Sequence, residues 1–86
     1  PVLDTFNYSA SAELYPSRRY AKSPREQYRR FKTAAEAIQY IVEDRPAAWL
    51  VGTFLEVAGR RYDGAAIRAL YDANGYPLAR NAAAAA

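Results

Sequence analysis

The sequence predicts a small single-domain α+β fold with the element order ββαββα, in which two helices cover one face of an antiparallel sheet. Three observations predict it. Apolar and polar residues alternate between 6 and 15, as they do in a half-buried strand. A helix-start motif at Thr33 opens an amphipathic segment. A run rich in β-branched and aromatic residues at 50–57 is followed by a second helix start at Asp63.

The first two predicted strands enclose a basic loop. Residues 6–15 form the first strand, and Pro16 ends it. The polar run that follows, as far as Pro24, contains little that could enter a core, so we expect an exposed loop. Residues 27–31 form a returning strand with Phe31 directed inward. The basic segment is therefore predicted to lie at the tip of a long hairpin.

The first helix has clear signals at both ends. Thr33 and Glu36 match the capping box, in which the two side chains satisfy free backbone donors. The apolar residues that follow share one helical stripe: Ala34, Ala37, Ile38, Ile41 and Val42. Pro46 ends the helix because proline disfavours helical geometry in the residue before it.

The second half of the chain repeats this order. Residues 50–57 form the third and most buried strand, expected at the centre of the sheet, with Trp49 at its entrance. A tight turn at 58–59 leads into a short strand at 60–62. Asp63 caps a second helix. The residues expected on the inward face of that helix are Ile67, Leu70 and Tyr71.

The two halves suggest a duplicated ββα unit. The triplet at 29–31 before the first helix parallels the triplet at 60–62 before the second. Two strand-to-helix junctions that face one shared core also look alike without a duplication, so both explanations stay open.

Four blocks of the sequence resemble a family of small uncharacterised α+β proteins from Alphaproteobacteria. The blocks are AELYPSR at 12–18, YRRFKTAAEAI at 28–38, IRALY at 67–71 and YPL at 76–78. Together they span most of residues 12–80. The resemblance implies a stable domain type, and it transfers no activity and no functional residues.

The length of the chain, 86 residues, leaves room for one core. We expect a single domain at 1–80 and a disordered or unassigned alanine-rich tail at 81–86. A core of this size contributes only about 3–5 kcal/mol. A protein partner or a homodimer is therefore expected to share in the stability.

The composition indicates the cellular compartment in which the protein is expected. The absence of cysteine excludes disulfides and cysteine metal sites and favours a soluble, cytoplasmic protein. The longest stretch without a charged residue, 46–55, has ten residues, whereas a membrane span needs about 18 or more. We therefore expect no membrane association.

The composition also argues against catalysis. The absence of histidine removes the commonest general base and metal ligand. The four glycines are not clustered, so no phosphate-binding loop is predicted. One carboxylate pair, Glu13 and Glu56, would have to be brought together by strand pairing. We expect no enzyme activity, no cofactor and no metal.

Positive charge is concentrated in residues 18–32, called the basic hairpin below. This segment has seven cations and one anion, whereas the rest of the chain has five cations and eight anions. Such asymmetry indicates an anionic partner. The candidate contacts with nucleic acid or another anion are Arg18, Arg19, Lys22, Arg25, Tyr28 and Arg30. The alternative is a solvated loop without a ligand.

Eight tyrosines are many for a chain of this length, and tyrosine is enriched at protein interfaces. Tyr40 lies off the apolar stripe of the first helix, so Tyr40 and Trp49 are the candidate protein contacts. The sequence therefore predicts a non-catalytic binding domain with a protein-interaction or accessory-subunit role. The alternative is a nucleic-acid-binding protein that uses the basic hairpin.

Overall fold

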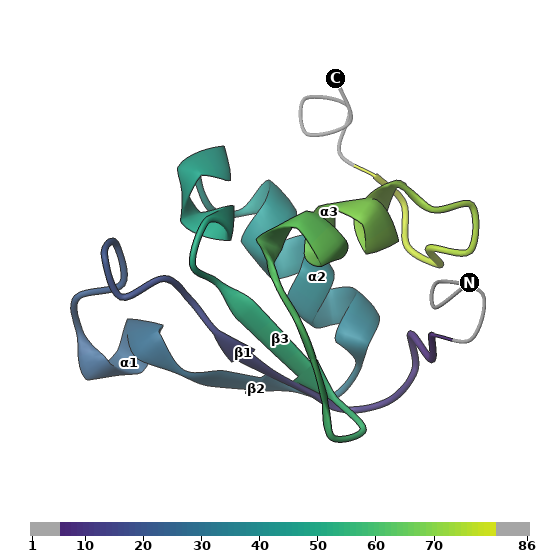
Figure 1. Cartoon of the computed structure of the whole chain (residues 1–86). Coiled ribbons are helices and arrows are strands. Elements are labelled where there is room, and N and C mark those ends of the chain that lie inside the picture. The colour runs from purple at the N-terminus through teal and green to yellow at the C-terminus, as the bar shows by residue number, and fades with distance from the viewer. Residues whose placement is uncertain (1–5, 81–86) are drawn as a thin grey trace.

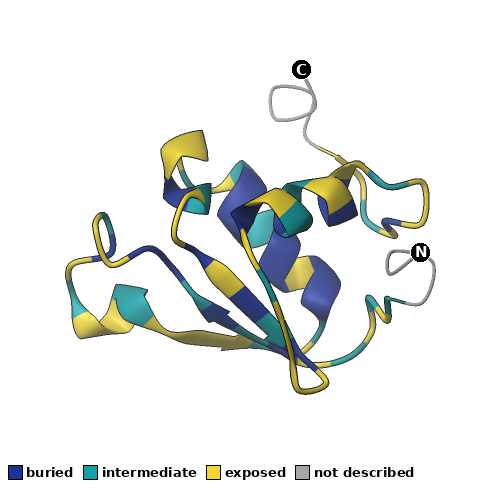
Figure 2. Ribbon diagram, in the orientation of Figure 1, coloured by how far each residue is buried: buried dark blue, intermediate teal, exposed yellow. Residues whose placement is uncertain are grey.

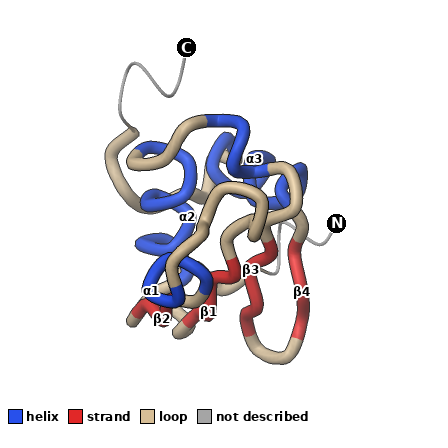
Figure 3. The backbone as a smooth tube through the Cα atoms, turned by 90° about the vertical axis from the view of Figure 1, so that its left-hand side faces the viewer, coloured by secondary structure: helices blue, strands red, loops and turns tan. Residues whose placement is uncertain are grey.

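The computed structural model describes residues 6–80. Its strands are β1 (Ala12–Tyr15), β2 (Arg29–Phe31), β3 (Phe54–Val57) and β4 (Arg60–Tyr62). Its helices are α1 (Pro24–Gln27), α2 (Ala34–Glu43), the 3-10 helix η2 (Ala47–Leu50) and α3 (Gly64–Asp72). The strands form one antiparallel sheet in the order β2-β1-β3-β4. Helices α2 and α3 lie on one side of this sheet, which confirms the predicted α+β class (Figures 1 and 3).

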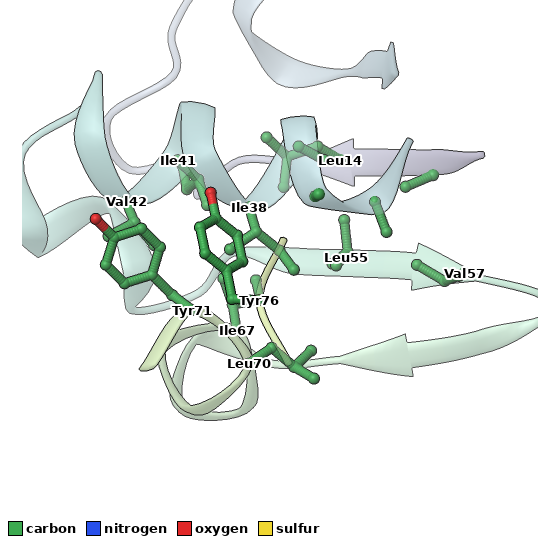
Figure 4. Packing of buried hydrophobic residues seen from close by; sticks show 14 of the residues in the cluster. Leu14, Ile38, Ile41, Val42, Leu55, Val57, Ile67, Leu70, Tyr71 and Tyr76 are labelled. Atoms are coloured by element: carbon green, nitrogen blue, oxygen red, sulfur yellow. The ribbon is translucent and has the colours of Figure 1, made fainter. Parts of the chain in front are cut away.

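The core lies between the sheet and the two long helices. Leu14 of β1 and Leu55 of β3 are fully buried and face the helices. The predicted stripe of α2 and the inward face of α3 are both buried against them (Figures 2 and 4). Among residues 6–80, no helix has the length and apolar composition needed to cross a bilayer. The expected tail at 81–86 lies outside the described residues.

The first strand is shorter than predicted, because residues 7–10 form a turn. The Ser9 N–H donates to the side-chain oxygen of Asn7 at 2.9 Å, and the Ala10 N–H donates to the Asn7 carbonyl. The carbonyls of Tyr8 and Ala10 then accept from the first N–H groups of α2. Those groups have no partner within their own helix. The segment before β1 therefore completes the start of α2 and adds nothing to the sheet.

The predicted second strand at 27–31 is wrong at its start, because residues 24–27 form α1. Pro24 is the first helical residue, and the Glu26 carboxylate accepts from the Ser23 N–H at 3.4 Å. This Ser-Pro-Arg-Glu sequence is itself a capping-box pattern with proline at the first helical position. The strand that remains, β2, pairs with β1 as the predicted hairpin requires.

The loop at the tip of the hairpin was expected to contribute little to the core, and this prediction is wrong. Ala21 is fully buried, and the ring of Tyr20 stacks on Trp49 with centroids 6.0 Å apart. The Ser17 N–H also donates to the Thr53 hydroxyl at 2.9 Å. These contacts fix the base of the loop, while its cations remain exposed.

The third strand is central, as predicted, but it begins four residues late. Residues 47–50 form η2, which places Trp49 in a helical turn and not at the entrance of a strand. Gly52 then takes a φ of +87°, which favours glycine. The buried Thr53 hydroxyl donates to the Trp49 carbonyl and closes the turn. The apolar run therefore divides into a turn and a strand.

The predicted helix starts are confirmed. The Thr33 hydroxyl oxygen accepts from the Glu36 N–H at 3.2 Å, and the Asp63 carboxylate accepts from the Ala66 N–H at 2.9 Å. The Glu36 carboxylate bonds to the Thr33 hydroxyl and not to its backbone, so the capping box is incomplete.

Each half of the chain pairs its strands in the same register. The equivalent pairs are Ala12–Phe31 and Leu55–Tyr62, Glu13–Arg30 and Glu56–Arg61, and Leu14–Arg29 and Val57–Arg60. The two central strands pair with Glu13 opposite Glu56. The register of the four strands therefore fits an approximate twofold axis between these two glutamates, and a helix follows the outer strand of each half.

Candidate functional site

The sheet has one face that neither α2 nor α3 covers. Because side chains alternate along a strand, the neighbours of the buried Ala12, Leu14, Leu55 and Val57 point away from the helices. We call this surface the open face. Its residues are Glu13, Tyr15, Tyr28, Arg30, Phe54, Glu56 and Arg61. All of them are half-buried or exposed.

Three aromatic side chains, Tyr15, Tyr28 and Phe54, form a row across the open face. Tyr15 lies directly opposite Phe54, and its ring centroid is 5.3 Å from that of Tyr28. Phe54 is 40% exposed and Tyr28 is 44% exposed. Tyr15 ends β1, Tyr28 precedes β2 and Phe54 begins β3. The aromatic row therefore lies at the end of the sheet from which the tip of the basic hairpin extends.

A charged row lies next to the aromatic row. In spatial order its members are Arg30, Glu13, Glu56 and Arg61. Arg61 approaches the Glu56 carboxylate at 3.6 Å, and its guanidinium carbon lies 5.9 Å from the ring centroids of both Tyr15 and Phe54. The Tyr28 hydroxyl donates to Glu13 at 2.7 Å, and this bond raises the pKa of Tyr28.

Strand pairing does bring Glu13 and Glu56 together, as a carboxylate pair for catalysis would require. Their setting, however, is an exposed sheet surface. Three grooves on the described residues are lined by other side chains. Within residues 6–80, no group of three or more potential ligand side chains could hold a metal ion.

The predicted nucleic-acid contacts are divided between two places. Arg18, Arg19, Lys22 and Arg25 are exposed at the tip of the basic hairpin, whereas Tyr28 and Arg30 belong to the open face. Arg29 points to the opposite side from Arg30, as the alternation of a regular strand predicts. The sequence interpretation missed Phe54 and Arg61. The alternation of side chains within 54–57 and 60–62 places both residues on the open face. This alternation can be recognised only when the boundaries of the two strands are known.

Tyr40, a predicted protein contact, lines a groove of about 470 Å³ between β2 and α2. Strand β2 forms one wall, and the other wall consists of Glu36, Gln39, Tyr40 and Asp44 of α2. Tyr40 is half-buried rather than exposed. The guanidinium of Arg29 lies 4.8 Å from its ring centroid and 5.2 Å from that of Phe31. The groove therefore has an aromatic and cationic floor.

Trp49, the other predicted protein contact, is connected to Tyr40 through Arg45. The Arg45 guanidinium lies 5.4 Å from the Tyr40 ring centroid and 5.0 Å from that of Trp49, and its Nε donates to the Tyr40 hydroxyl at 2.9 Å. Only 9% of Trp49 is exposed. Its role in the fold is to support Tyr20 and Arg45, and it offers little surface of its own to a partner.

Comparison of the chain with models of protein families, with curated proteins and with solved structures finds no match.

Proposed function

We propose that the chain is a non-catalytic protein-interaction domain, and that an extended segment of its partner binds beside β2 in the groove between β2 and α2. The observation that carries this proposal is the position of β2. It is an edge strand of the sheet, and an edge strand presents backbone donors and acceptors that a further strand can pair with.

The groove supports this binding mode. Among the described residues, no backbone–backbone hydrogen bond outside the helices and strands involves Arg29, Arg30 or Phe31. The wall formed by α2 lies alongside and offers Gln39, Tyr40 and two carboxylates to the side chains of a bound segment. Main-chain pairing gives affinity in such complexes, and side-chain pockets give specificity.

The walls of the groove are already ordered. The Arg29 guanidinium contacts the rings of both Phe31 and Tyr40, and Tyr40 is fixed by the hydrogen bond from Arg45. A side chain that is immobilised before binding loses less entropy when the partner arrives. This preorganisation favours a binding role for a domain that lacks histidine and cysteine.

The test is affinity capture with two matched variants. Gln39→Arg places a long cation in the groove, while Ala69→Arg makes the same change in charge at an exposed position of α3 outside it. We expect a partner from the source cells to bind the intact chain and Ala69→Arg, and to be lost with Gln39→Arg. A partner that binds both variants equally, or the absence of any partner, would contradict the proposal.

A further inference from the structure

A second surface, the open face, has a different chemistry. Its three aromatic rings are carried by β1, β3 and the residue before β2, and two of them are at least 40% exposed. Elsewhere in the described chain, the rings of Tyr71 and Tyr76 are buried in the core. Exposed rings grouped on one side of a four-stranded sheet are a recurrent platform on which unpaired bases stack.

We propose that the open face binds single-stranded nucleic acid, with bases stacked on Tyr15, Tyr28 and Phe54 and phosphates held by the exposed cations at the tip of the basic hairpin. This inference goes beyond the proposed protein-interaction groove and uses a different surface. A base presents a flat aromatic face whatever its identity, so stacking of this kind tolerates many sequences.

The charge distribution favours a polyanion as the ligand. The aromatic row lies at the end of the sheet where the tip of the basic hairpin joins β1 to β2. Arg18, Arg19, Lys22 and Arg25 are exposed there. Their side chains can follow a phosphate backbone while the bases lie on the sheet. Arg61 adds a cation beside the rings of Tyr15 and Phe54.

The carboxylate pair favours this ligand over a second copy of the chain. Glu13 and Glu56 lie in the middle of the open face, one row further from the hairpin than the rings. A flat protein partner that covered the face would remove both carboxylates from water, which is costly unless each is paired. A nucleic-acid strand that keeps its phosphates on the hairpin side leaves them in solvent. Duplex DNA keeps its bases stacked inside and cannot reach the rings.

The experiment measures binding of the full chain to a labelled single-stranded oligonucleotide of mixed sequence by fluorescence anisotropy over a range of salt concentrations. Phe54→Leu and Tyr28→Leu remove an aromatic ring but keep an apolar side chain, so the sheet is expected to fold. We expect each to weaken binding about fivefold or more. With about four phosphates contacted, the slope of log affinity against log salt should be about −3.

Matched control variants distinguish the loss of stacking on the aromatic row from effects that any substitution of similar size or charge would have. Val51→Ala shortens an apolar side chain that is 78% exposed and outside the open face, and it should bind like the intact chain. Arg61→Ala and Arg60→Ala remove the same charge from neighbouring residues of β4 that point to opposite sides. Arg61→Ala should weaken binding more than Arg60→Ala does.

Each of the following results would overturn the proposal, provided that circular dichroism shows the variants to be folded. They are no binding at all, equal or tighter binding to the corresponding duplex, unchanged binding by both leucine variants, and self-association of the chain that Phe54→Leu abolishes. Loss of binding only when the four cations at the hairpin tip are replaced by alanine would place the ligand on the hairpin alone, which also overturns the stacking platform.

Discussion

Glu13 and Glu56 lie directly opposite each other on the two central strands, where the approximate twofold axis of the fold passes between them. Two like charges at such positions repel each other across the strand pair. On its outer side Glu13 accepts a hydrogen bond from the Tyr28 hydroxyl and lies opposite Arg30 without an ion pair, while Glu56 pairs with Arg61. The sheet therefore retains a like-charge pair at its centre that its neighbours only partly offset.

Replacement of Glu13 by glutamine should stabilise the protein. The amide oxygen can still accept the hydrogen bond from Tyr28, while the repulsion from Glu56 disappears. We expect a gain of about 0.2–1 kcal/mol in the free energy of unfolding at neutral pH and low salt. Urea unfolding measures it. The gain should shrink at high salt because ions screen the repulsion, and a loss of stability would show that the contacts of Glu13 with Tyr28 and Arg30 outweigh its repulsion from Glu56.

Local signals in the sequence predicted the parts of the fold that depend on neighbouring residues. The caps at Thr33 and Asp63 and the stripes of both helices are of this kind, because capping and helical periodicity act within a few residues. The short Ser23 helix was also predictable. Its signal is the sequence Ser-Pro-Arg-Glu at 23–26, which lies between the predicted loop and the predicted second strand.

The errors occur where distant contacts decide the structure. Tyr8 and Ala10 alternate as in a strand, yet their carbonyls are used by α2 and the Tyr8 hydroxyl donates to the Leu70 carbonyl at 2.8 Å. In the same way, the open face could not be located before the register of β3 was known. A strand pattern shows that two faces differ, but the packing of the helices decides which face holds Phe54 and Arg61.

A substitution in the turn between β3 and β4 should raise the stability of the protein. Ala58 and Gly59 both have positive φ, at 52° and 79°, as a two-residue hairpin turn of type I′ requires. Alanine pays about 1 kcal/mol for this conformation, whereas asparagine adopts it more readily. Ala58→Asn is therefore expected to raise the free energy of unfolding by up to about 1 kcal/mol. No change in the midpoint of thermal unfolding would show that the turn is not strained.

Gly64 should not tolerate even a methyl group. A Cβ at this position would lie 1.9 Å from the Leu50 carbonyl oxygen, because the start of α3 packs directly on η2. The backbone would have to move, so Gly64→Ala should destabilise the protein by about 1–3 kcal/mol or more. Gly75→Ala is the matched control, since the nearest atom to its Cβ would be 3.7 Å away. Similar melting temperatures for the two variants would contradict this packing.

Thr53 connects the base of the basic hairpin to η2. Its buried hydroxyl accepts from the Ser17 N–H and donates to the Trp49 carbonyl. Thr53→Val keeps the shape but leaves two backbone groups without partners, which should cost about 2 kcal/mol or more. Thr53→Ser retains the hydroxyl and should lower the free energy of unfolding by a smaller amount. If valine proved no worse than serine in chemical denaturation, the hydrogen bonds would not be what holds the loop.

Tyr76 and Tyr8 should differ in their response to the loss of a hydroxyl. The buried Tyr76 hydroxyl has no hydrogen-bond partner among residues 6–80, whereas that of Tyr8 bonds to Leu70. At neutral pH, Tyr8→Phe should therefore cost about 1 kcal/mol, while Tyr76→Phe should be neutral or stabilising. Thermal unfolding of the two variants under the same conditions measures this difference.

At alkaline pH, Tyr76 should lower the stability of the folded chain. Burial raises the pKa of its hydroxyl well above the ordinary value of 10.0, so above about pH 10 the unfolded chain loses this proton while the folded chain retains it. A raised folded-state pKa gives stability that is present below the unfolded pKa and is lost as pH rises further. The intact chain should therefore lose stability above pH 10 more steeply than Tyr76→Phe. Parallel curves for the two proteins would mean that the Tyr76 hydroxyl reaches solvent when it ionises.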